Sequence, residues 1–365
     1  MEKKYLVINI GSASKKCGLY GKAELCGVHM EKTSKGFIGT VWAGNDRQEV
    51  LITETDYDDV GAYLMRVANE KNIAQINDIT KIGVRIVAPG IFFQEDKIID
   101  DAYVARLMEV KDMAPLHIVP ILEELTKIKI WADSIPLLGV SDSAFYKDMP
   151  KEAKLYGLPK ELTEKYEIYR YGYHGISMSS VLTAIKKSQN DVPEKLIICH
   201  LGSGSTITAL KKSQPIDTSM GFTPLEGIPM GSRVGNIDAS VILYLLKRGY
   251  FDVSEMETVL YKESGLLGLS GKTAFVKELI DLERAGDVSA GEALSVFIRT
   301  IKKYIGAYSA LLGGLDLLVF TATIGERSEY IRDKIISGLE YLDAKTLVVL
   351  TDEMTEMAKR CDAQF

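Results

Sequence analysis

The sequence predicts an α/β fold made of two similar domains. Its 365 residues are enough for roughly two domains at ~150 residues each. One pattern occurs twice: the apolar run 5–10 ends in Gly11-Ser12-Ala13-Ser14, and the apolar run 197–201 ends in Gly202-Ser203-Gly204-Ser205. The two segments match position for position. This match suggests a duplicated architecture in which each domain offers a phosphate-binding turn to a shared cleft.

Composition and charge exclude several classes of partner. Hydrophobic residues make up 46% of the chain and charged residues 26%, a balance typical of a globular protein rather than a disordered one. The formal net charge of -6 gives no electrostatic reason to expect nucleic acid or an anionic membrane as a partner, and we expect neither. An anionic ligand must therefore be held by local cations and N–H groups.

The cysteines and the N-terminus indicate a cytoplasmic protein. Cys17, Cys26, Cys199 and Cys361 show no paired metal-ligand spacing, and reduced thiols are their simplest interpretation. The first apolar run is too short for a signal peptide, and no run approaches the ~18 apolar residues of a membrane span.

Strands and helices alternate along the chain. The expected strands cover residues 5–10, 17–20, 81–87, 135–140, 197–201, 317–320 and 346–350. The expected helices cover residues 58–71, 101–111, 117–128, 177–187, 289–312 and a short C-terminal segment. The charged, proline-containing stretch 147–160 is the best candidate for a crossover between domains. We expect one domain to comprise residues 1–146 plus 353–365 and the other residues 147–352.

The longest helix is expected from Ser289 to Leu312. Ser289 and Glu292 are spaced as a capping box, and Gly313-Gly314 predicts the end of the helix. Its apolar residues recur on one face, which indicates a stripe that faces the core and has a structural role. The stripe consists of Leu294, Phe297, Ile298, Ile301, Ile305, Tyr308 and Leu312.

Two common nucleotide-binding motifs are incomplete. A dinucleotide fingerprint would need glycine in place of Ile207 after Gly202 and Gly204, and the chain continues there as a strand. A P-loop would need glycine at Leu266, ahead of Gly271-Lys272-Thr273, with a strand leading into it. Neither motif is therefore expected.

The remaining pattern is typical of phosphoryl transfer. Gly-Ser turns offer N–H and hydroxyl groups to a phosphate, while Arg85 and Arg233 each lie near the end of a strand. Asp142 and Glu353 also follow expected strands, and carboxylates at such positions can hold a divalent ion. From spacing alone, the alternative that these turns are only structural stays open.

Over almost its full length the chain resembles the acetate/propionate/butyrate kinase family. Residues 217–227, Asp-Thr-Ser-Met-Gly-Phe-Thr-Pro-Leu-Glu-Gly, are nearly diagnostic. The other matching stretches are 7–14, 114–117, 141–145, 170–175, 199–202, 231–238 and 324–326. The resemblance implies two similar domains of the sugar kinase/Hsp70/actin (ribonuclease H-like) type around a central cleft.

The resemblance also implies a reaction. The protein is expected to transfer a phosphoryl group from ATP, with Mg²⁺ or Mn²⁺, to acetate or propionate. The transfer is expected to be in-line and reversible, giving acyl phosphate and ADP. The expected partners are a small carboxylate, a nucleotide and a second copy of the chain in a homodimer. The first domain is expected to bind the acyl group and metal, and the second to bind nucleotide and form the dimer.

Site residues follow from the same resemblance. Catalytic roles are implied for Arg85, Asp142, His174 and Arg233. Metal binding is implied for Asn9, Asp142 and Glu353. Nucleotide binding is implied for Ser12, Ser14, Lys16, His200, Gly202, Ser203, Gly204, Gly325 and Glu326. The acyl group is expected to contact Val87, Leu116, His117, Tyr173 and Pro224.

Several positions depart from the family pattern. Ala88-Pro89-Gly90 replaces His-Gly-Gly, and Tyr173 replaces Phe, which adds a hydroxyl beside the acyl group. On the nucleotide side, Phe275, Lys277 and Arg327 replace Asp, Arg and Asn. Two alternatives therefore stay open: a pyrophosphate-dependent acyl kinase, and a catalytically weakened relative that senses nucleotide or acyl phosphate.

Overall fold

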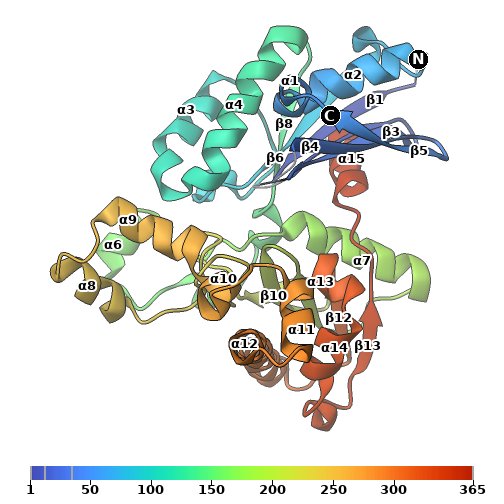
Figure 1. Ribbon diagram of the computed structural model, residues 1–365. Coiled ribbons are helices and arrows are strands. Elements are labelled where there is room, and N and C mark those ends of the chain that lie inside the picture. The colour runs from blue at the N-terminus through green and yellow to red at the C-terminus, as the bar shows by residue number, and fades with distance from the viewer. Residues whose placement is uncertain (1, 12–13, 34–35, 364–365) are drawn as a thin grey trace. The chain divides into compact units, whose positions relative to one another are not determined.

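The computed structural model describes residues 2–11, 14–33 and 36–363, which form two compact units (Figure 1). Unit 1 comprises Met1–Lys147, Gly175–Ser180 and Asp352–Phe365. Unit 2 comprises Asp148–His174 and Val181–Thr351. Residues 175–180, which were expected in the second domain, thus group with unit 1.

Within the described residues, unit 1 contains an eight-stranded sheet. In spatial order its strands are β5 (Asp46–Ile52), β4 (Gly36–Ala43), β3 (Glu24–Thr33), β2 (Ser14–Tyr20), β1 (Lys4–Ile10), β6 (Ile79–Ile86), β8 (Leu137–Ser141) and β7 (Lys97–Ile98). Strand β1 is antiparallel to β2 and parallel to β6, which in turn is parallel to β8. The helices grouped with this sheet are α1 (Glu54–Asp58), α2 (Val60–Glu70), α3 (Asp101–Glu109), α4 (Pro115–Ala132) and α15 (Glu353–Ala363).

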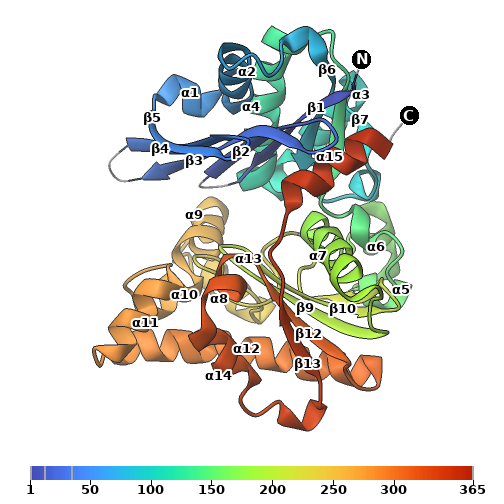
Figure 2. The same cartoon turned by 90° about the vertical axis from the view of Figure 1, so that its right-hand side faces the viewer.

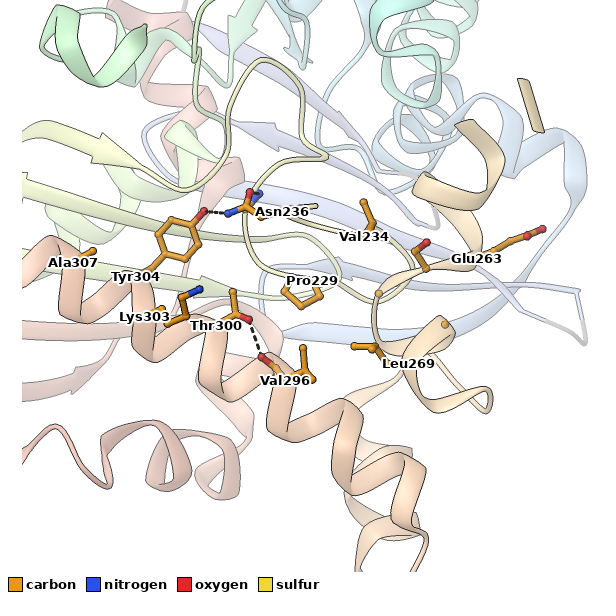
Figure 3. Close-up of a pocket in the computed structure, with 14 residues that line it drawn as sticks. Pro229, Val234, Asn236, Glu263, Leu269, Val296, Thr300, Lys303, Tyr304 and Ala307 are labelled. Carbon is orange, nitrogen blue, oxygen red and sulfur yellow. Dashed lines mark hydrogen bonds between the residues drawn. The ribbon is translucent and has the colours of Figure 1, made fainter. Parts of the chain in front are cut away.

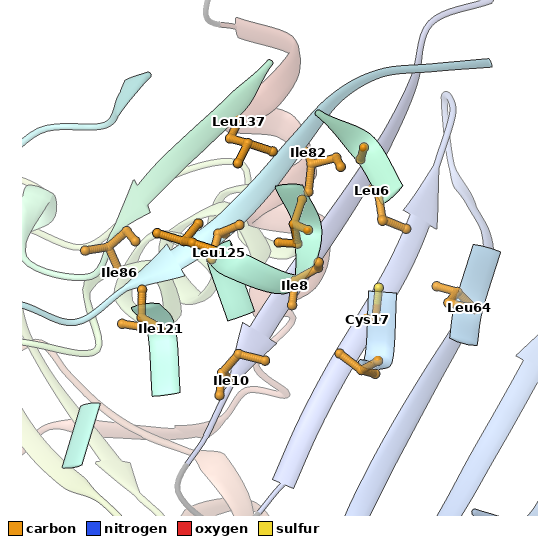
Figure 4. Packing of buried hydrophobic residues seen from close by; sticks show 14 of the residues in the cluster. Leu6, Ile8, Ile10, Cys17, Leu64, Ile82, Ile86, Ile121, Leu125 and Leu137 are labelled. Atoms are coloured by element: carbon orange, nitrogen blue, oxygen red, sulfur yellow. The ribbon is translucent and has the colours of Figure 1, made fainter. Parts of the chain in front are cut away.

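The central strand of unit 1 is buried on both faces. Leu6, Ile8 and Ile10 of β1 belong to the core that includes residues of α2 and α4 (Figure 4). Tyr5 and Val7 alternate with them and belong to a second cluster with residues of α15. Figure 2 accordingly shows α2 and α4 on one side of this sheet and α15 on the other. Apolar helix faces on both sides of the sheet explain why β1 is a nearly continuous apolar run.

Unit 2 is built on a five-stranded sheet in the part of the chain that is described. Its order is β11 (Gln214–Thr218), β10 (Ser205–Lys211), β9 (Lys195–Leu201), β12 (Leu317–Thr321) and β13 (Lys345–Val348). The helices after the first crossover are α5 (Lys151–Lys154), α6 (Lys160–Lys165), α7 (Gly175–Gln189), α8 (Ala239–Lys247), α9 (Val253–Thr258), α10 (Gly265–Ser270), α11 (Val276–Arg284), α12 (Val288–Leu312), α13 (Ala322–Arg327) and α14 (Glu329–Ile336). The first two turns of α7 group with unit 1.

The two sheets share one connection order. In unit 2, β9 is antiparallel to β10, which is antiparallel to β11, and β12 is parallel to both β9 and β13. The same sequence of pairings joins β1, β2, β3, β6 and β8 in unit 1. The prediction of an α/β protein with two similar domains is therefore confirmed.

The long helix α12 confirms one prediction and corrects another. Its predicted stripe lies against the sheet of unit 2, with Phe297, Ile301 and Ile305 fully buried, and the helix ends at Gly313 with φ 69°. The predicted capping box is wrong. Asp287 is the N-cap and accepts from the N–H of Ala290 at 2.9 Å, while the hydroxyl of Ser289 donates to Asp287.

A membrane-spanning helix does not occur in residues 2–11, 14–33 and 36–363, because none is both long and apolar enough.

Candidate active site

Polar side chains gather at the carboxyl ends of three neighbouring strands in unit 1. Asn9 lies one residue before the end of β1, Arg85 one residue before the end of β6, and Asp142 directly after β8. Because β1, β6 and β8 are parallel neighbours, their carboxyl ends lie along one edge of the sheet. Glu353 joins them from the first residue of α15.

A continuous network of hydrogen bonds connects these four side chains. Arg85 donates from Nη2 to Asp142 Oδ2 at 2.7 Å and from Nη1 to Asn9 Oδ1 at 3.1 Å. Asn9 donates from Nδ2 to Glu353 Oε2 at 3.0 Å. The guanidinium of Arg85 is thereby fixed in orientation by two partners, one on β1 and one directly after β8.

This hydrogen-bond network is largely buried. The side chain of Asp142 is 0% exposed and that of Arg85 13% exposed. Burial alone lowers the pKa of Arg85, but attraction by the carboxylates of Asp142 and Glu353 outweighs it and raises that pKa above its ordinary value. Arg85 therefore remains charged throughout the physiological pH range and can serve as a fixed cation.

The predicted metal ligands offer suitable donor atoms. In the described part of the chain, no group of three or more His, Cys, Asp and Glu residues is arranged to hold a metal ion. Mg²⁺, however, commonly uses only one or two carboxylates and completes its coordination with water and substrate phosphates. Asp142, Glu353 and the amide oxygen of Asn9 are hard oxygen donors of this kind. They fit a magnesium ion that arrives with a phosphate-bearing substrate.

A second group of polar side chains gathers in unit 2 around two histidines. The rings of His174 and His200 are stacked, with centroids 4.2 Å apart. Nδ1 of His174 lies 2.8 Å from the hydroxyl oxygen of Thr206, which is fully buried on β10. His174 itself has a left-handed backbone, with φ 62° and ψ 24°, at the residue that precedes α7. The ring is thus held from one face by His200 and at one nitrogen by Thr206.

Gly204 and Arg233 complete this second group. A Cβ atom at Gly204 would lie 3.1 Å from Nε2 of His174 and 3.7 Å from Nη1 of Arg233. The absence of a side chain at Gly204 therefore lets the histidine and the arginine approach the turn. Nη1 of Arg233 also donates to the carbonyl oxygen of Pro224 at 3.2 Å.

In each unit the first glycine of the Gly-Ser segment donates its N–H to a carbonyl two or three residues later. The N–H of Gly11 donates to the carbonyl of Ser14 at 2.8 Å, and the N–H of Gly202 donates to that of Gly204 at 3.1 Å. Ser203 is exposed, and Lys16 lies on β2 directly opposite Asn9. Ser12, a predicted nucleotide-binding residue, lies outside the described residues.

Gly325 and Glu326 make structural contacts in α13. Oε1 of Glu326 accepts from the N–H groups of Ala322 and Thr351, both at 3.0 Å. Gly325 packs closely against the backbone of Phe320 and Cys199. Ala322, at φ 64°, lies beside Gly202, where an added Cβ would be 3.5 Å from the Cβ of Ala322. The structure therefore brings α13 next to the Gly-Ser turn of unit 2.

The five predicted acyl-binding residues divide between the units. Val87, Leu116 and His117 belong to unit 1, whereas Tyr173 and Pro224 belong to unit 2. The hydroxyl of Tyr173 donates to the carbonyl of Phe222 at 2.7 Å, and the residue is 1% exposed. The hydroxyl that distinguishes Tyr173 from the usual Phe is thus bonded to the backbone.

Thr206 was missed by sequence reasoning. It lies on β10 opposite His200 in the strand register, a pairing that the structure shows and local sequence pattern does not. Arg170 and Glu226 were noted only as parts of matching motifs, yet they form an ion pair at 2.5 Å in unit 2.

A separate pocket of about 650 Å³ lies in unit 2 (Figure 3). Its lining comes from the segment 227–236, from residues 263–269 in and just before α10, and from one face of α12. It includes none of the predicted site residues. Gly265, which lines the pocket, has φ 62° and packs against the backbone of Met230 and Arg233. The pocket therefore borders the segment that carries Arg233.

Comparisons with known proteins agree with this geometry. The profile of the Acetokinase family matches residues 4–363. An acetate kinase of Bacillus cytotoxicus is 36% identical over 361 residues, covering 96% of this chain and 91% of that protein. An acetate kinase of Shouchella clausii is 37% identical over 346 residues, covering 93% and 88%. Among solved structures, a propionate kinase from Francisella tularensis subsp. tularensis SCHU S4 superposes with a TM-score of 0.88 at 30% identity, covering 98% of each chain. The Porphyromonas gingivalis acetate kinase gives 0.84 at 27% identity, covering 99% of each.

The ion pair between Arg85 and Asp142 makes a stability prediction. Asp142→Ala should lower the free energy of unfolding by about 3–5 kcal/mol, because it leaves a largely buried guanidinium without its carboxylate. Urea denaturation followed by tryptophan fluorescence measures this loss in unit 1, which contains both tryptophans, Trp42 and Trp131. Lys129→Ala, which removes an exposed ion pair with Asp101, is the control and should change little. A loss for Asp142→Ala as small as that of the control would contradict the prediction.

Proposed function

The chain belongs to the acetokinase family, and we propose that it transfers the γ-phosphoryl group of ATP reversibly to acetate or propionate. The products are the acyl phosphate and ADP. The observation that carries this proposal is Arg85, a buried and permanently charged guanidinium held in place by Asp142 and Asn9 at the edge of the sheet. A fixed cation of this kind suits an acceptor that is itself a small anion.

The acceptor explains why the site needs no general base. A carboxylate is ionised at neutral pH, so it can attack a phosphoryl group without losing a proton first. We assign Arg85 and Arg233 to hold the acyl carboxylate and to offset charge on the transferring group. Asp142 is already engaged with Arg85 and is better suited to orientation and metal binding than to proton abstraction. Transfer is then a single displacement without a covalent enzyme intermediate.

His174 is assigned to the transferring phosphoryl group. Thr206 and His200 fix its ring, and Gly204 leaves the space beside Nε2 free of a side chain. A fixed hydrogen-bond donor is useful here because charge on the phosphoryl oxygens is spread in the transition state. His200, Gly202, Ser203 and Gly204 are proposed to contact the donor, as are Ser14, Lys16, Gly325 and Glu326.

Mg²⁺ or Mn²⁺ would be held by Asp142 and Glu353 with Asn9. When bound, it would supply positive charge to the phosphates of the donor.

ATP is the proposed donor rather than pyrophosphate. Phe275, at the start of α11, is 67% exposed and offers an aromatic face on which a nucleobase could stack. Pyrophosphate has no group that would use such a surface. The ordered bonding of Asn9, Arg85, Asp142 and Glu353 also favours an active enzyme over a weakened sensor.

We also propose a homodimer formed through unit 2. Helix α8 carries Val241, Leu243 and Tyr244, which are 43%, 53% and 53% exposed, and none of its described residues is buried in the single chain. A second copy could cover this apolar face. Sedimentation at the mass of one chain, 40.4 kDa, at micromolar concentration would rule the dimer out. The proposed location is the cytoplasm, in keeping with four cysteines that are buried and unpaired.

A hydroxamate assay for acyl phosphate tests the proposed reaction. Acetate, propionate and butyrate are each paired with ATP and with pyrophosphate in the presence of Mg²⁺. Product is expected from ATP with acetate or propionate and is not expected from pyrophosphate. Product from pyrophosphate alone would support the other donor, and no product from any pair would support the sensor.

Replacement of Arg233 tests its assigned role. Arg233→Ala should lower kcat/KM by about 10²–10³-fold, since it removes a cation directed at the reacting groups, while the melting temperature stays close to that of the unchanged protein. Arg284→Ala is the matched control. Arg284 is the last residue of α11 and contacts the ring of Tyr330, and it has no assigned role in the site. Near-normal turnover by Arg233→Ala would remove Arg233 from the mechanism.

A further inference from the structure

The segment 221–227 of unit 2 has no helix or strand to hold its shape. It follows β11 and contains Pro224, whose carbonyl oxygen accepts from Nη1 of Arg233 at 3.2 Å. The position of this segment therefore affects where the guanidinium of Arg233 points. Its own backbone forms no regular structure, so bonds from outside the segment must fix it, among them one from the N–H of Tyr171 to the carbonyl of Gly221 at 3.1 Å.

Glu226 ties the two ends of the segment together. Its Oε1 accepts from Nη1 of Arg170 at 2.5 Å, and its Oε2 accepts from the hydroxyl of Tyr156. The same hydroxyl accepts from the N–H of Phe222 at 2.8 Å. A Cβ atom at Gly221 would lie only 1.6 Å from Oε2 of Glu226, so the carboxylate folds directly over this glycine. One carboxylate thus links the late part of the segment to its beginning.

Arg170 also balances a second carboxylate. Burial alone lowers the pKa of Arg170, but interactions with Glu226, Tyr156 and, more weakly, Asp217 outweigh it and raise that pKa. Burial raises the pKa of Asp217. Arg170 is fixed in turn by a bond from its Nε to the carbonyl of Ala153 at 3.2 Å. The arginine therefore holds Glu226 through a charged bond that is itself anchored in the fold.

Two more tyrosines bond to the same segment. Tyr173 donates to the carbonyl of Phe222 at 2.7 Å, and Tyr261 donates to the hydroxyl of Thr223 at 3.1 Å. These bonds act on residues 222 and 223. Beyond Pro224 the segment is held by Glu226 and by Gly227, whose N–H donates to Oδ1 of Asn236 at 3.0 Å and whose carbonyl accepts from the N–H of Asn236 at 2.8 Å. The carbonyl that accepts from Arg233 lies between the two sets.

We infer that Glu226, held by Arg170 and Tyr156, is a positioning residue that sets the Pro224–Arg233 contact and thereby the affinity for the acceptor carboxylate. This inference rests on the proposed kinase function. Glu226 does not touch the reacting atoms; it acts through the backbone of Pro224 and the side chain of Arg233. A displacement of about 1 Å in a reacting or binding group can lower a rate by as much as about 10²-fold.

Glu226→Gln tests the inference, because it keeps the shape of the side chain and removes the charge. The KM for acetate should rise about tenfold or more and kcat should fall, while the KM for ATP stays within about twofold. Glu283→Gln is the matched control. Glu283 accepts from the hydroxyl of Tyr330 at 2.6 Å, so it is also a tyrosine-bonded glutamate of unit 2, but it lies on α11. Its kinetic constants should be unchanged.

Tyr156→Phe provides a second variant if Glu226→Gln does not fold. It keeps the Arg170–Glu226 pair and removes only the hydroxyl that links Glu226 to Phe222. The KM for acetate should rise less than in Glu226→Gln, and the effects of the two substitutions should not add in the double variant, because both act on one network.

Amide hydrogen exchange provides a readout that does not depend on activity. Peptides covering residues 218–236 should exchange faster in Glu226→Gln than in Glu283→Gln. If the unchanged protein makes no acyl phosphate, the proposed function fails, but exchange still reports whether Glu226 holds the segment. Unchanged exchange, or faster exchange with an unchanged KM for acetate, would overturn the inference.

Discussion

The buried charge of Arg85 is the constraint on which unit 1 depends. A guanidinium that is 13% exposed is costly to bury unless its donors are paired, and Asp142 and Asn9 supply the partners at 2.7 and 3.1 Å. These partners can reach Arg85 only because β1, β6 and β8 are parallel neighbours that end at one edge. The order of strands, the apolar helices on both faces and the position of α15 with Glu353 all place polar groups at that edge. The bonds that pair the charge of Arg85 also fix the orientation of the group that we propose to bind the acyl carboxylate.

Unit 2 has the same strand topology as unit 1 but a different set of polar side chains. Its Gly-Ser turn follows β9, the strand that corresponds to β1 of unit 1, and lies beside two stacked histidines and Arg233. Gly204 matters because a side chain there would occupy the space next to Nε2 of His174. The two sheets thus share one topology, but unit 1 carries an arginine–carboxylate network and unit 2 a histidine–arginine group.

Much of the fold could be predicted from local pattern. The apolar runs at 5–10 and 197–201 are strands that occupy corresponding places in the two sheets, and the stripe from Leu294 to Leu312 is the buried face of α12. The helix start was mispredicted because Ser289 and Asp287 are both good capping residues, and only geometry shows that Asp287 accepts from Ala290. Bonds between distant residues were beyond local pattern: Asn9 and Glu353 are 344 positions apart, and Thr206 and His174 are 32 apart. The assigned roles of these residues in catalysis remain predictions.

The stereochemical course at phosphorus tests the central claim most directly. That claim is a single in-line transfer from ATP to a carboxylate, with Arg85 and Arg233 as fixed cations and no covalent enzyme intermediate. ATP with an isotopically chiral γ-phosphoryl group would be used with acetate, and the configuration of phosphorus in the acetyl phosphate would be determined. One displacement inverts the configuration, and inversion is the result that the account predicts. Retention would require an even number of displacements and would contradict it.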